Sequence, residues 1–435
     1  MRTEATWDDA RRSASRSGRE GGARRSSTAA RPLVGLFILW LAVLTVFLLA
    51  QVEARGIRSY VLGLDFRPYY TGGLMLLGGV KADFYALPTQ YLWQRAFAPE
   101  VSDPSWLLPF LNPPFVAAPL ALVAALPLET AYVAWLGLNV ALLAAVCRRL
   151  VRTLEGTRLR VTVYTLALSL TFAPVWVAAM QGQVSFVLVL ALLGGWAALR
   201  SGRDLHGGLW LALLLVKPQL LLAPALALAW RRRLQALAGL ALGGAALFGA
   251  SLALVGWEGL EGYARLTVGA SSWGEAYGVH PQRMHTWRGF LHLLLGTNDP
   301  SEVQPWWLLG VVLALGLLLW TWRGRWNPQS QHFALQWATL VVVMLLISPH
   351  VNFHDLSLLM VPGVLLARYL ASLEQAGRLD KVLTRLPLVG YLATWMALFA
   401  SSDLRLQPSV LFMLLALLML ACAAGLSRRR ATSAA

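Results

Sequence analysis

The sequence contains few charged residues and almost no cysteine. Only 13% of its 435 residues are charged, whereas a water-soluble domain carries roughly 25%, and this deficit argues against an ordinary soluble protein. The two cysteines, Cys147 and Cys422, lie far apart within apolar segments. They therefore offer neither a metal-binding spacing nor a disulfide framework.

Lysine is also scarce, although the chain is strongly basic. Lys81, Lys217 and Lys381 are its only lysines, so the net charge of +16 comes almost entirely from arginine. The arginines form short clusters between apolar runs, a distribution that orients membrane helices and is not typical of a nucleic-acid-binding surface. We therefore expect membrane lipids as partners, and no nucleic acid.

Two motifs of nucleotide-sugar chemistry are missing. The sequence has no DxD-type pair of acids for a metal ion, and no glycine-rich phosphate loop follows a strand. It therefore predicts no metal, no other cofactor and no soluble nucleotide. Short segments of alternating hydrophobicity, which mark a membrane β-barrel, do not occur either.

Long apolar runs recur between residues 32 and 426. We expect an all-α polytopic membrane protein of about ten full spans, because runs of roughly 17–25 apolar residues match the bilayer core. Short re-entrant or broken helices and amphipathic outer helices should accompany these spans. The membrane domain covers residues 32–427, between a disordered basic tail (1–31) and a short C-terminal tail (428–435), both predicted to be cytoplasmic.

The positions of the basic residues predict which loops lie on each side of the membrane. If the first span leaves the cytoplasm, 27 of the 37 Lys and Arg residues lie inside and nine outside, as the positive-inside rule requires. The large loops 52–112 and 257–304 are then extracytoplasmic. This arrangement predicts a multi-pass protein of the inner cell membrane.

Two apolar stretches do not fit simple spans. The segment 114–127 is too short and too rich in proline to cross, so we interpret it as re-entrant. The stretch 207–233 has basic residues in both flanks and the pair Lys217-Pro218 near its centre. Because proline removes a backbone donor and clashes with the preceding turn, this stretch predicts a helical hairpin broken at depth.

The most informative polar residues lie in the predicted outer segments. Asp65 opens the first outer loop within "GLDFRPYYTGG", beside Arg67 and Tyr69. Lys217 stands at the hairpin centre, and a cation at that depth costs roughly 2.5–3.5 kcal/mol unless it lines a cavity or is paired. The remaining candidates for substrate binding are Gln183, Gln219, His285, Arg288, His350, His354 and Asp355.

Structural roles can explain several of these residues. Asp65 can be the N-cap of an amphipathic helix, and the pair Gly182-Gln183 can form the turn at a helix end. His350 and His354 can be ordinary residues of the membrane interface. Arg288 can extend its guanidinium to the membrane surface.

Six motifs in order resemble those of a known family. They are "DFRPYYTGGLMLLGGVKADFY", "NPPF", "GQVSFVLVLALLGGW", "GGLWLALLLVKPQLLLAPAL", "TWRGFLHLLLG" and "SPHVNFHDLSLL". With them the chain resembles the bacterial polyprenol-phosphate-mannose-dependent mannosyltransferases, glycosyltransferase family 87 of the GT-C superfamily. The resemblance extends over about residues 33–426.

The resemblance implies a GT-C-like bundle that transfers a hexose, mannose in this family, from a polyprenyl-phosphate donor to a glycolipid or glycan acceptor. Transfer would occur on the extracytoplasmic face with inversion, and Asp65 would be the catalytic base. Segments 182–183, 217–219 and 348–350 would line the site, and Asp355 would help to hold the last turn. The outer block reads "MHTWRG" where relatives begin with Asn and Ser, which leaves the acceptor open.

The residues themselves are suited to this chemistry. A carboxylate at the outer face can take the proton of an attacking hydroxyl, and Lys217, Arg288 and His350 can stabilise a departing phosphate. A lipid or polysaccharide transporter or flippase would share the basic cavity and the broken helix. A GT-C enzyme that uses glucose or arabinose, or a non-catalytic assembly subunit, also remains open.

Overall fold

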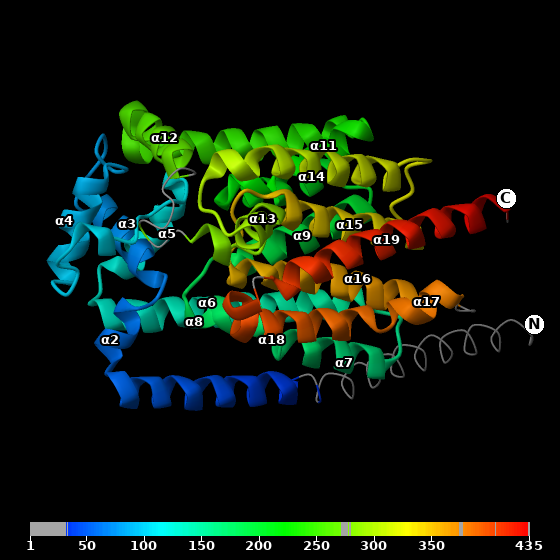
Figure 1. Cartoon of the computed structure of the whole chain (residues 1–435), viewed down its shortest axis with the longest axis horizontal. Helices are drawn as coiled ribbons and strands as arrows, with labels where there is room; N and C mark the ends of the chain where they lie inside the picture. The colour runs from blue at the N-terminus through cyan, green and yellow to red at the C-terminus, as the bar shows by residue number, and fades with distance from the viewer. Residues whose placement is uncertain are drawn as a thin grey trace, which may run out of the picture.

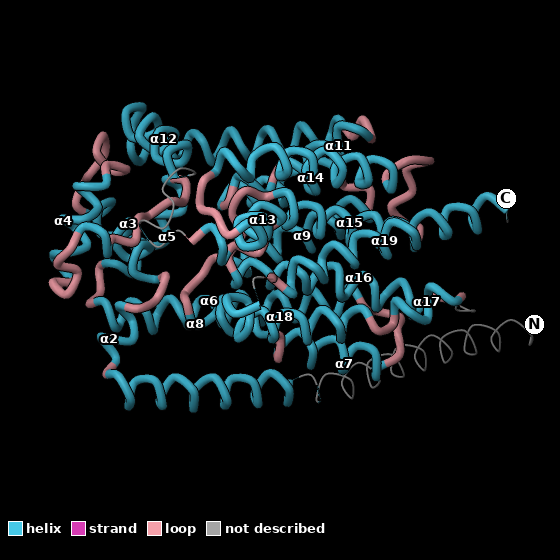
Figure 2. The backbone as a smooth tube through the Cα atoms, viewed as in Figure 1, coloured by secondary structure: helices cyan, strands magenta, loops and turns pink. Residues whose placement is uncertain are grey.

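The computed structural model describes residues 32, 34–270, 277, 280–373, 377–404 and 406–433. The predicted tail 1–31 lies outside these residues. Every regular element in the described part is helical, and no strand occurs there (Figure 2). The predicted all-α class is confirmed. The last helix, α19 (Pro408–Ser433), continues through most of the predicted C-terminal tail.

Several helices are long and apolar enough to cross a membrane. Among the described residues there are six: Val34–Arg55, α6 (Leu128–Thr153), α12 (Leu234–Ala270), α14 (Pro300–Thr321), Phe353–Ala371 and Pro408–Arg428. A seventh crossing arises if α7 (Leu159–Leu170) and α8 (Ala173–Met180), which meet at a bend of 50°, count as one span. A polytopic membrane protein is confirmed, but a count of ten full spans is not.

Two of the missing spans are helices that are apolar but short. α9 (Ser185–Arg200) has 16 residues and α15 (Gln331–Ile347) has 17. At 1.5 Å per residue they are about 24–26 Å long, which is less than the roughly 30 Å of a bilayer core. The predicted re-entrant stretch likewise forms two short helices, η2 (Pro114–Val116) and α5 (Ala117–Ala124).

The predicted broken hairpin is present. Its two arms consist of α10 (Asp204–Ala212) with η3 (Leu213–Val216), and η4 (Pro218–Leu220) with α11 (Leu222–Trp230). Between the arms, Lys217 leaves the helical conformation, with φ −133° and ψ 84°. At the far end, Arg233 Nε donates to Asp204 Oδ2 at 2.8 Å. This ion pair ties the ends of the arms together and leaves Lys217 at the tip.

α15 is the central helix of the bundle. All its residues from Phe333 to Ile347 are buried, and it packs against α11, α14, α16 (Met360–Ala371) and α19. A helix that is apolar on every side must be surrounded by other helices. Its Gln336 Nε2 donates to the backbone oxygen of Thr321 at 3.0 Å, so this buried amide group is satisfied.

The two ends of the bundle differ in character. At one end lie basic loops, where Arg368 Nη1 donates to Thr153 O at 2.5 Å and Arg200 Nη1 to Gln329 O at 3.3 Å. α17 (Arg378–Leu383) lies at this end, near the C terminus in Figure 1. We call it the basic end. The connection between α17 and α18 (Leu386–Leu404) lies there too.

The opposite end carries the long connections. Figure 1 shows the outer helices there: α2 (Ile57–Leu62), α3 (Phe66–Leu77) and α4 (Leu87–Phe97). α12 kinks at Gly256, where φ is +70°, before it continues to Ala270. The short helices η6 (Pro281–Arg283), α13 (Trp287–Leu295) and η7 (Phe353–Leu359) complete the connections that surround the site described next.

Candidate active site

A cavity of about 300 Å³ opens among these outer connections. Its wall includes eight of the residues predicted from the sequence, which come from stretches that are far apart in the chain. They are Asp65, Tyr69, Gln183, Lys217, Gln219, Arg288, His350 and His354. We call this space the Asp65 cavity. The predicted candidates Arg67, His285 and Asp355 do not line it.

Asp65 occupies the N-cap position of α3, but its side chain does not cap the helix. Its Oδ2 instead accepts a hydrogen bond from Gln183 Nε2 at 2.8 Å, and its backbone N–H donates to Gln181 Oε1 at 2.8 Å. The side chain is 40% exposed. The carboxylate is therefore held from one side and open to the cavity on another, as a general base requires.

Gln183 orients the Asp65 carboxylate. Tyr69 Oη donates to Gln183 Oε1 at 2.8 Å. Burial and the neighbouring Asp65 raise the pKa of Tyr69 well above its usual value, so this hydroxyl stays protonated. Because the amide oxygen accepts from Tyr69, the amide nitrogen points to Asp65. This geometry makes Gln183 a positioning residue for the carboxylate.

Gly182 makes this arrangement possible. Its φ is +70°, and a Cβ atom at this position would come within 3.1 Å of the Phe66 Cβ. Glycine alone adopts such a left-handed conformation without strain. The turn brings the side chains of both Gln181 and Gln183 to Asp65.

Lys217 is paired within the protein. Its Nζ donates to Asp355 Oδ1 at 2.6 Å, and the two side chains are only 12% and 1% exposed. Asp355 Oδ2 also accepts from the backbone N–H of Asn352 at 3.2 Å, so it holds the turn as expected. The sequence analysis expected a cation at this depth to line a cavity or to be paired. Lys217 does both, and Asp355 compensates its charge within the protein.

His354 lies between the two carboxylates. Its Nδ1 is 3.7 Å from Asp65 Oδ2, and its Nε2 is 3.5 Å from Asp355 Oδ1. Lys217 Nζ is 3.2 Å from the same Nε2. The side chain of His354 is only 4% exposed, so it connects the exposed carboxylate with the buried ion pair.

Arg288 is a cation that has no ionic partner in the described part of the chain. Thr286 Oγ1 accepts from the Gly289 N–H at 3.0 Å and starts α13, which places Arg288 in the first turn. Its guanidinium carbon lies 5.6 Å from the ring centre of Trp307. The buried Nε has no hydrogen-bond partner among the described residues. Of Lys217 and Arg288, the arginine is therefore the one available to a bound anion.

His350 lines the cavity as a neutral group. Burial and the charge of Lys217 lower the pKa of His350 to about 4. At neutral pH it can exchange hydrogen bonds but does not supply the positive charge that the sequence suggested. Its backbone oxygen accepts from Gln219 Nε2 at 3.4 Å, which links this turn to the hairpin tip.

Two predicted site residues support the walls from outside the cavity. His285 is buried, its Nδ1 is 2.8 Å from Ser409 Oγ, and its backbone N–H donates to Val351 O at 2.8 Å. It therefore connects the outer loop with α19 and with the turn before η7. Arg67 Nη2 donates to Trp106 O at 2.9 Å and fixes the loop around η1 (Pro104–Trp106).

Some residues that shape the site were not predicted. Asn112 lines the cavity, and its Nδ2 donates to Val216 O at 3.1 Å. Two buried glutamines of α4 hold the chain segment that precedes Asn112. Gln94 Oε1 accepts from the Leu108 N–H at 3.1 Å, and Gln90 Oε1 accepts from the Phe110 N–H at 2.7 Å. Their spacing of four residues puts both on one helix face, a signal that the sequence contained.

The Lys217–Asp355 pair gives a stability prediction. Lys217→Ala leaves the Asp355 carboxylate buried without its partner, so the free energy of unfolding should fall by roughly 3–5 kcal/mol. Unfolding of the purified protein in detergent measures this. The double variant Lys217→Ala with Asp355→Ala should recover much of the loss. Equal stability of the wild type and Lys217→Ala would show that the pair does not stabilise the fold.

His285 gives a prediction for pH. Burial and His354 lower the pKa of His285 from 6.5 to about 4. At a pH between these two pKa values, His285 binds more protons in the unfolded chain than in the folded chain. The free energy of unfolding therefore falls as the pH falls from 6.5 towards 4. Between pH 7 and pH 5 this one group contributes a loss on the order of 2 kcal/mol. His285→Gln should therefore show a smaller drop in unfolding temperature, and an unchanged drop would contradict the assignment.

The described residues show no group of three or more His, Cys, Asp or Glu side chains placed to hold a metal ion. Within that part of the chain, the site consists of one exposed carboxylate, a buried ion pair with His354 beside it, and Arg288. The expected independence from metals and cofactors stays a prediction.

One family matches the chain. A sequence profile of glycosyltransferase family 87 matches residues 110–349, more than half of the chain. The match includes Gln183, Lys217 and Arg288, whereas Asp65 and His354 lie outside it. Comparison with curated proteins and with solved structures gave no match. The family resemblance is confirmed: the chain belongs to glycosyltransferase family 87 and is a membrane glycosyltransferase.

Proposed function

We propose that this enzyme transfers a hexose, the mannose implied by its resemblance, from a polyprenyl-phosphate donor to a glycolipid or glycan acceptor. Transfer takes place on the extracytoplasmic face of the inner membrane and inverts the anomeric carbon. One observation supports this most: the exposed carboxylate of Asp65 lines the same cavity as the guanidinium of Arg288, which has no ionic partner among the described residues.

The proposed reaction is a single displacement. The acceptor hydroxyl attacks the anomeric carbon, its proton passes to the Asp65 carboxylate, and the bond between that carbon and the phosphate oxygen breaks. Polyprenyl phosphate leaves with the bonding electrons. A double displacement would need a second group as nucleophile. Asp355 is a poor candidate, because it is 1% exposed and paired with Lys217.

Arg288 would stabilise the departing phosphate. A guanidinium presents its donors in a planar fork that matches phosphate oxygens. Charge that develops on the leaving group is stabilised most where the donors are already fixed and water is scarce. Arg288 is 9% exposed and lines the cavity without an ionic partner among the described residues. Binding of a phosphate therefore requires no ion pair to be broken.

The basic loops support an extracytoplasmic site. They lie at the basic end, away from the Asp65 cavity, and basic loops remain in the cytoplasm. The polyprenyl chain of a lipid-linked donor would lie in the membrane. Its phosphate would then lie at the membrane surface, at the level of the outer connections.

A reconstituted transfer assay tests the proposal. The purified protein is incubated with labelled polyprenyl-phosphate mannose and a lipid extract of the cell envelope as acceptor. We expect mannose in a new product, free polyprenyl phosphate, and the opposite anomeric configuration in the product. Parallel donors with glucose or arabinose should react more slowly. Movement of intact donor across proteoliposomes without release of polyprenyl phosphate would instead show a flippase.

A further inference from the structure

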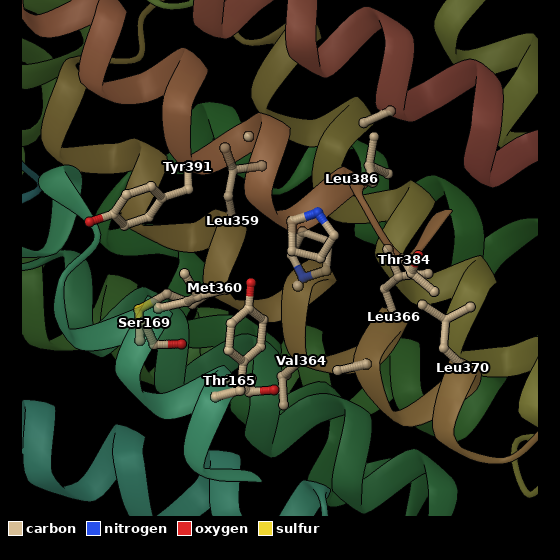
Figure 3. A pocket seen from close by; sticks show the side chains of 18 of the residues that line it. Thr165, Ser169, Leu359, Met360, Val364, Leu366, Leu370, Thr384, Leu386 and Tyr391 are labelled. Atoms are coloured by element: carbon tan, nitrogen blue, oxygen red, sulfur yellow. The ribbon is translucent and has the colours of Figure 1, made fainter. Parts of the chain in front are cut away.

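A second pocket lies between helices of the bundle and is partly open to the outside. It has a volume of about 690 Å³ and is lined mainly by residues of α7, α16, α18 and α19. It shares no lining residue with the Asp65 cavity. Its wall is mainly aliphatic, and Figure 3 shows the labelled side chains around it, among them Leu359, Met360, Val364, Leu366 and Leu370. We call it the apolar pocket.

Hydrocarbon is the natural content of this pocket. Protein interiors pack closely. If a space of this size were empty, the side chains that line it would lose many dispersion contacts. Water is a poor filler, because each molecule needs two to four polar partners. Lipid chains of the surrounding bilayer are the apolar molecules at hand, and they are shaped to enter a gap between helices.

The pocket extends to the basic end of the bundle. Its lining includes Arg160 at the start of α7, Ala371 at the end of α16, and Thr384 before α18. In Figure 3, Ser169 and Tyr391 lie towards one side of the pocket and Thr384 and Leu370 towards the other. A headgroup at this mouth would therefore lie in the leaflet opposite the Asp65 cavity.

The mouth is positively charged. Arg160 is the only charged residue among those that line the pocket. Arg158, Lys381 and Arg385 lie within three residues of a lining residue along the chain, and all four basic residues are exposed. None of the four makes an ion pair with another residue that the structure describes. Such a mouth complements an anionic headgroup.

We propose that the apolar pocket binds an anionic phospholipid of the cytoplasmic leaflet. Its acyl chain lies among α7, α16, α18 and α19, and its phosphate lies at Arg160. The polyprenyl chain of a donor fits less well. Its phosphate would have to lie in the Asp65 cavity at the opposite end, and the two spaces have no wall in common. The proposal does not depend on the transfer reaction.

Gly363 offers a direct way to fill the pocket. It lines the pocket on α16, and a Cβ atom built there meets no atom within 4 Å. Gly363→Phe should therefore place a ring in the space that the acyl chain would use. Gly249→Phe is the matched control, because Gly249 on α12 is also free of neighbours within 4 Å and does not line the pocket.

The experiment is native mass spectrometry of the full-length protein in detergent, titrated with phosphatidylglycerol or phosphatidylcholine. We expect the wild type and Gly249→Phe to hold one phosphatidylglycerol and to bind phosphatidylcholine more weakly. Gly363→Phe should lose this binding. Arg160→Gln should weaken phosphatidylglycerol binding about fivefold, the effect of one basic residue near an anionic headgroup, with phosphatidylcholine unchanged.

Three results would overturn the proposal. Equal binding of the two phospholipids by the wild type would exclude recognition of the headgroup. Unchanged binding in both Gly363→Phe and Arg160→Gln would place the lipid elsewhere. Displacement of the bound lipid by polyprenyl phosphate, but not by added phosphatidylglycerol, would assign the pocket to the donor chain. Size-exclusion chromatography of each variant separates a loss of binding from a loss of folding.

Discussion

Asp65→Asn should lower the turnover number by about 10²–10⁴-fold, the usual contribution of a general base. The substitution removes the proton acceptor and little else, because the amide oxygen of Asn can still accept from Gln183 Nε2 as the carboxylate does at 2.8 Å. Donor affinity and unfolding temperature should stay close to those of the wild type. Transfer kinetics with labelled donor, a donor-binding titration and a thermal unfolding measurement give the three quantities.

Asp83→Asn is the matched control for this experiment. Asp83 is an exposed acid of the same outer loop, and it does not line the Asp65 cavity. Its variant should transfer sugar at the rate of the wild type. Near-normal turnover of Asp65→Asn would remove Asp65 from the chemistry, whatever its position in the cavity.

Arg288→Gln should give the second large effect. Removal of one fixed donor to a developing anion slows catalysis by about 10²–10³-fold, and we expect a similar loss here. Glutamine keeps a hydrogen-bond donor near the position of Arg288 Nε, but it is shorter than arginine and has no charge. The loss should therefore appear in kcat/KM for the donor and in binding of polyprenyl phosphate, the proposed product.

Arg67→Gln controls for loss of an arginine in the outer segments. Arg67 is bonded to the backbone oxygen of Trp106 and does not line the cavity, so its variant should affect stability more than turnover. Equal losses of kcat/KM in the two variants, or none in Arg288→Gln, would contradict the proposed contact between Arg288 and phosphate.

Much of the architecture could be predicted from local sequence. The break at Lys217 follows from a proline beside a charged residue within an apolar run, and the separation of basic loops from the Asp65 segment follows from the arginine clusters. Span lengths were harder to predict. α9 and α15 are apolar along their whole length, but neighbouring helices bury them, and the sequence of a buried helix resembles that of a spanning one.

The pairings within the site could not be predicted. Lys217 and Asp355 are 138 residues apart, and a sequence alone shows the charge but not its partner. The neutral state of His350 depends on burial and on Lys217, which are properties of the fold. Asp65 was identified because it is an acid in the predicted outer loop, within a motif that resembles family 87. The role of Gln183 became visible only through its bonds to Tyr69 and Asp65.

Membrane sidedness is the claim on which the donor, the reaction and the site all depend. It can be measured with two matched serine-to-cysteine variants, after Cys147 and Cys422 are replaced by alanine. Ser105 is exposed in the loop beside the Asp65 cavity, and Ser201 is exposed at the basic end. In intact cells, a membrane-impermeant maleimide should label Ser105→Cys and should reach Ser201→Cys only after permeabilisation. Labelling of Ser201→Cys but not Ser105→Cys in intact cells would place the cavity in the cytoplasm and contradict the account.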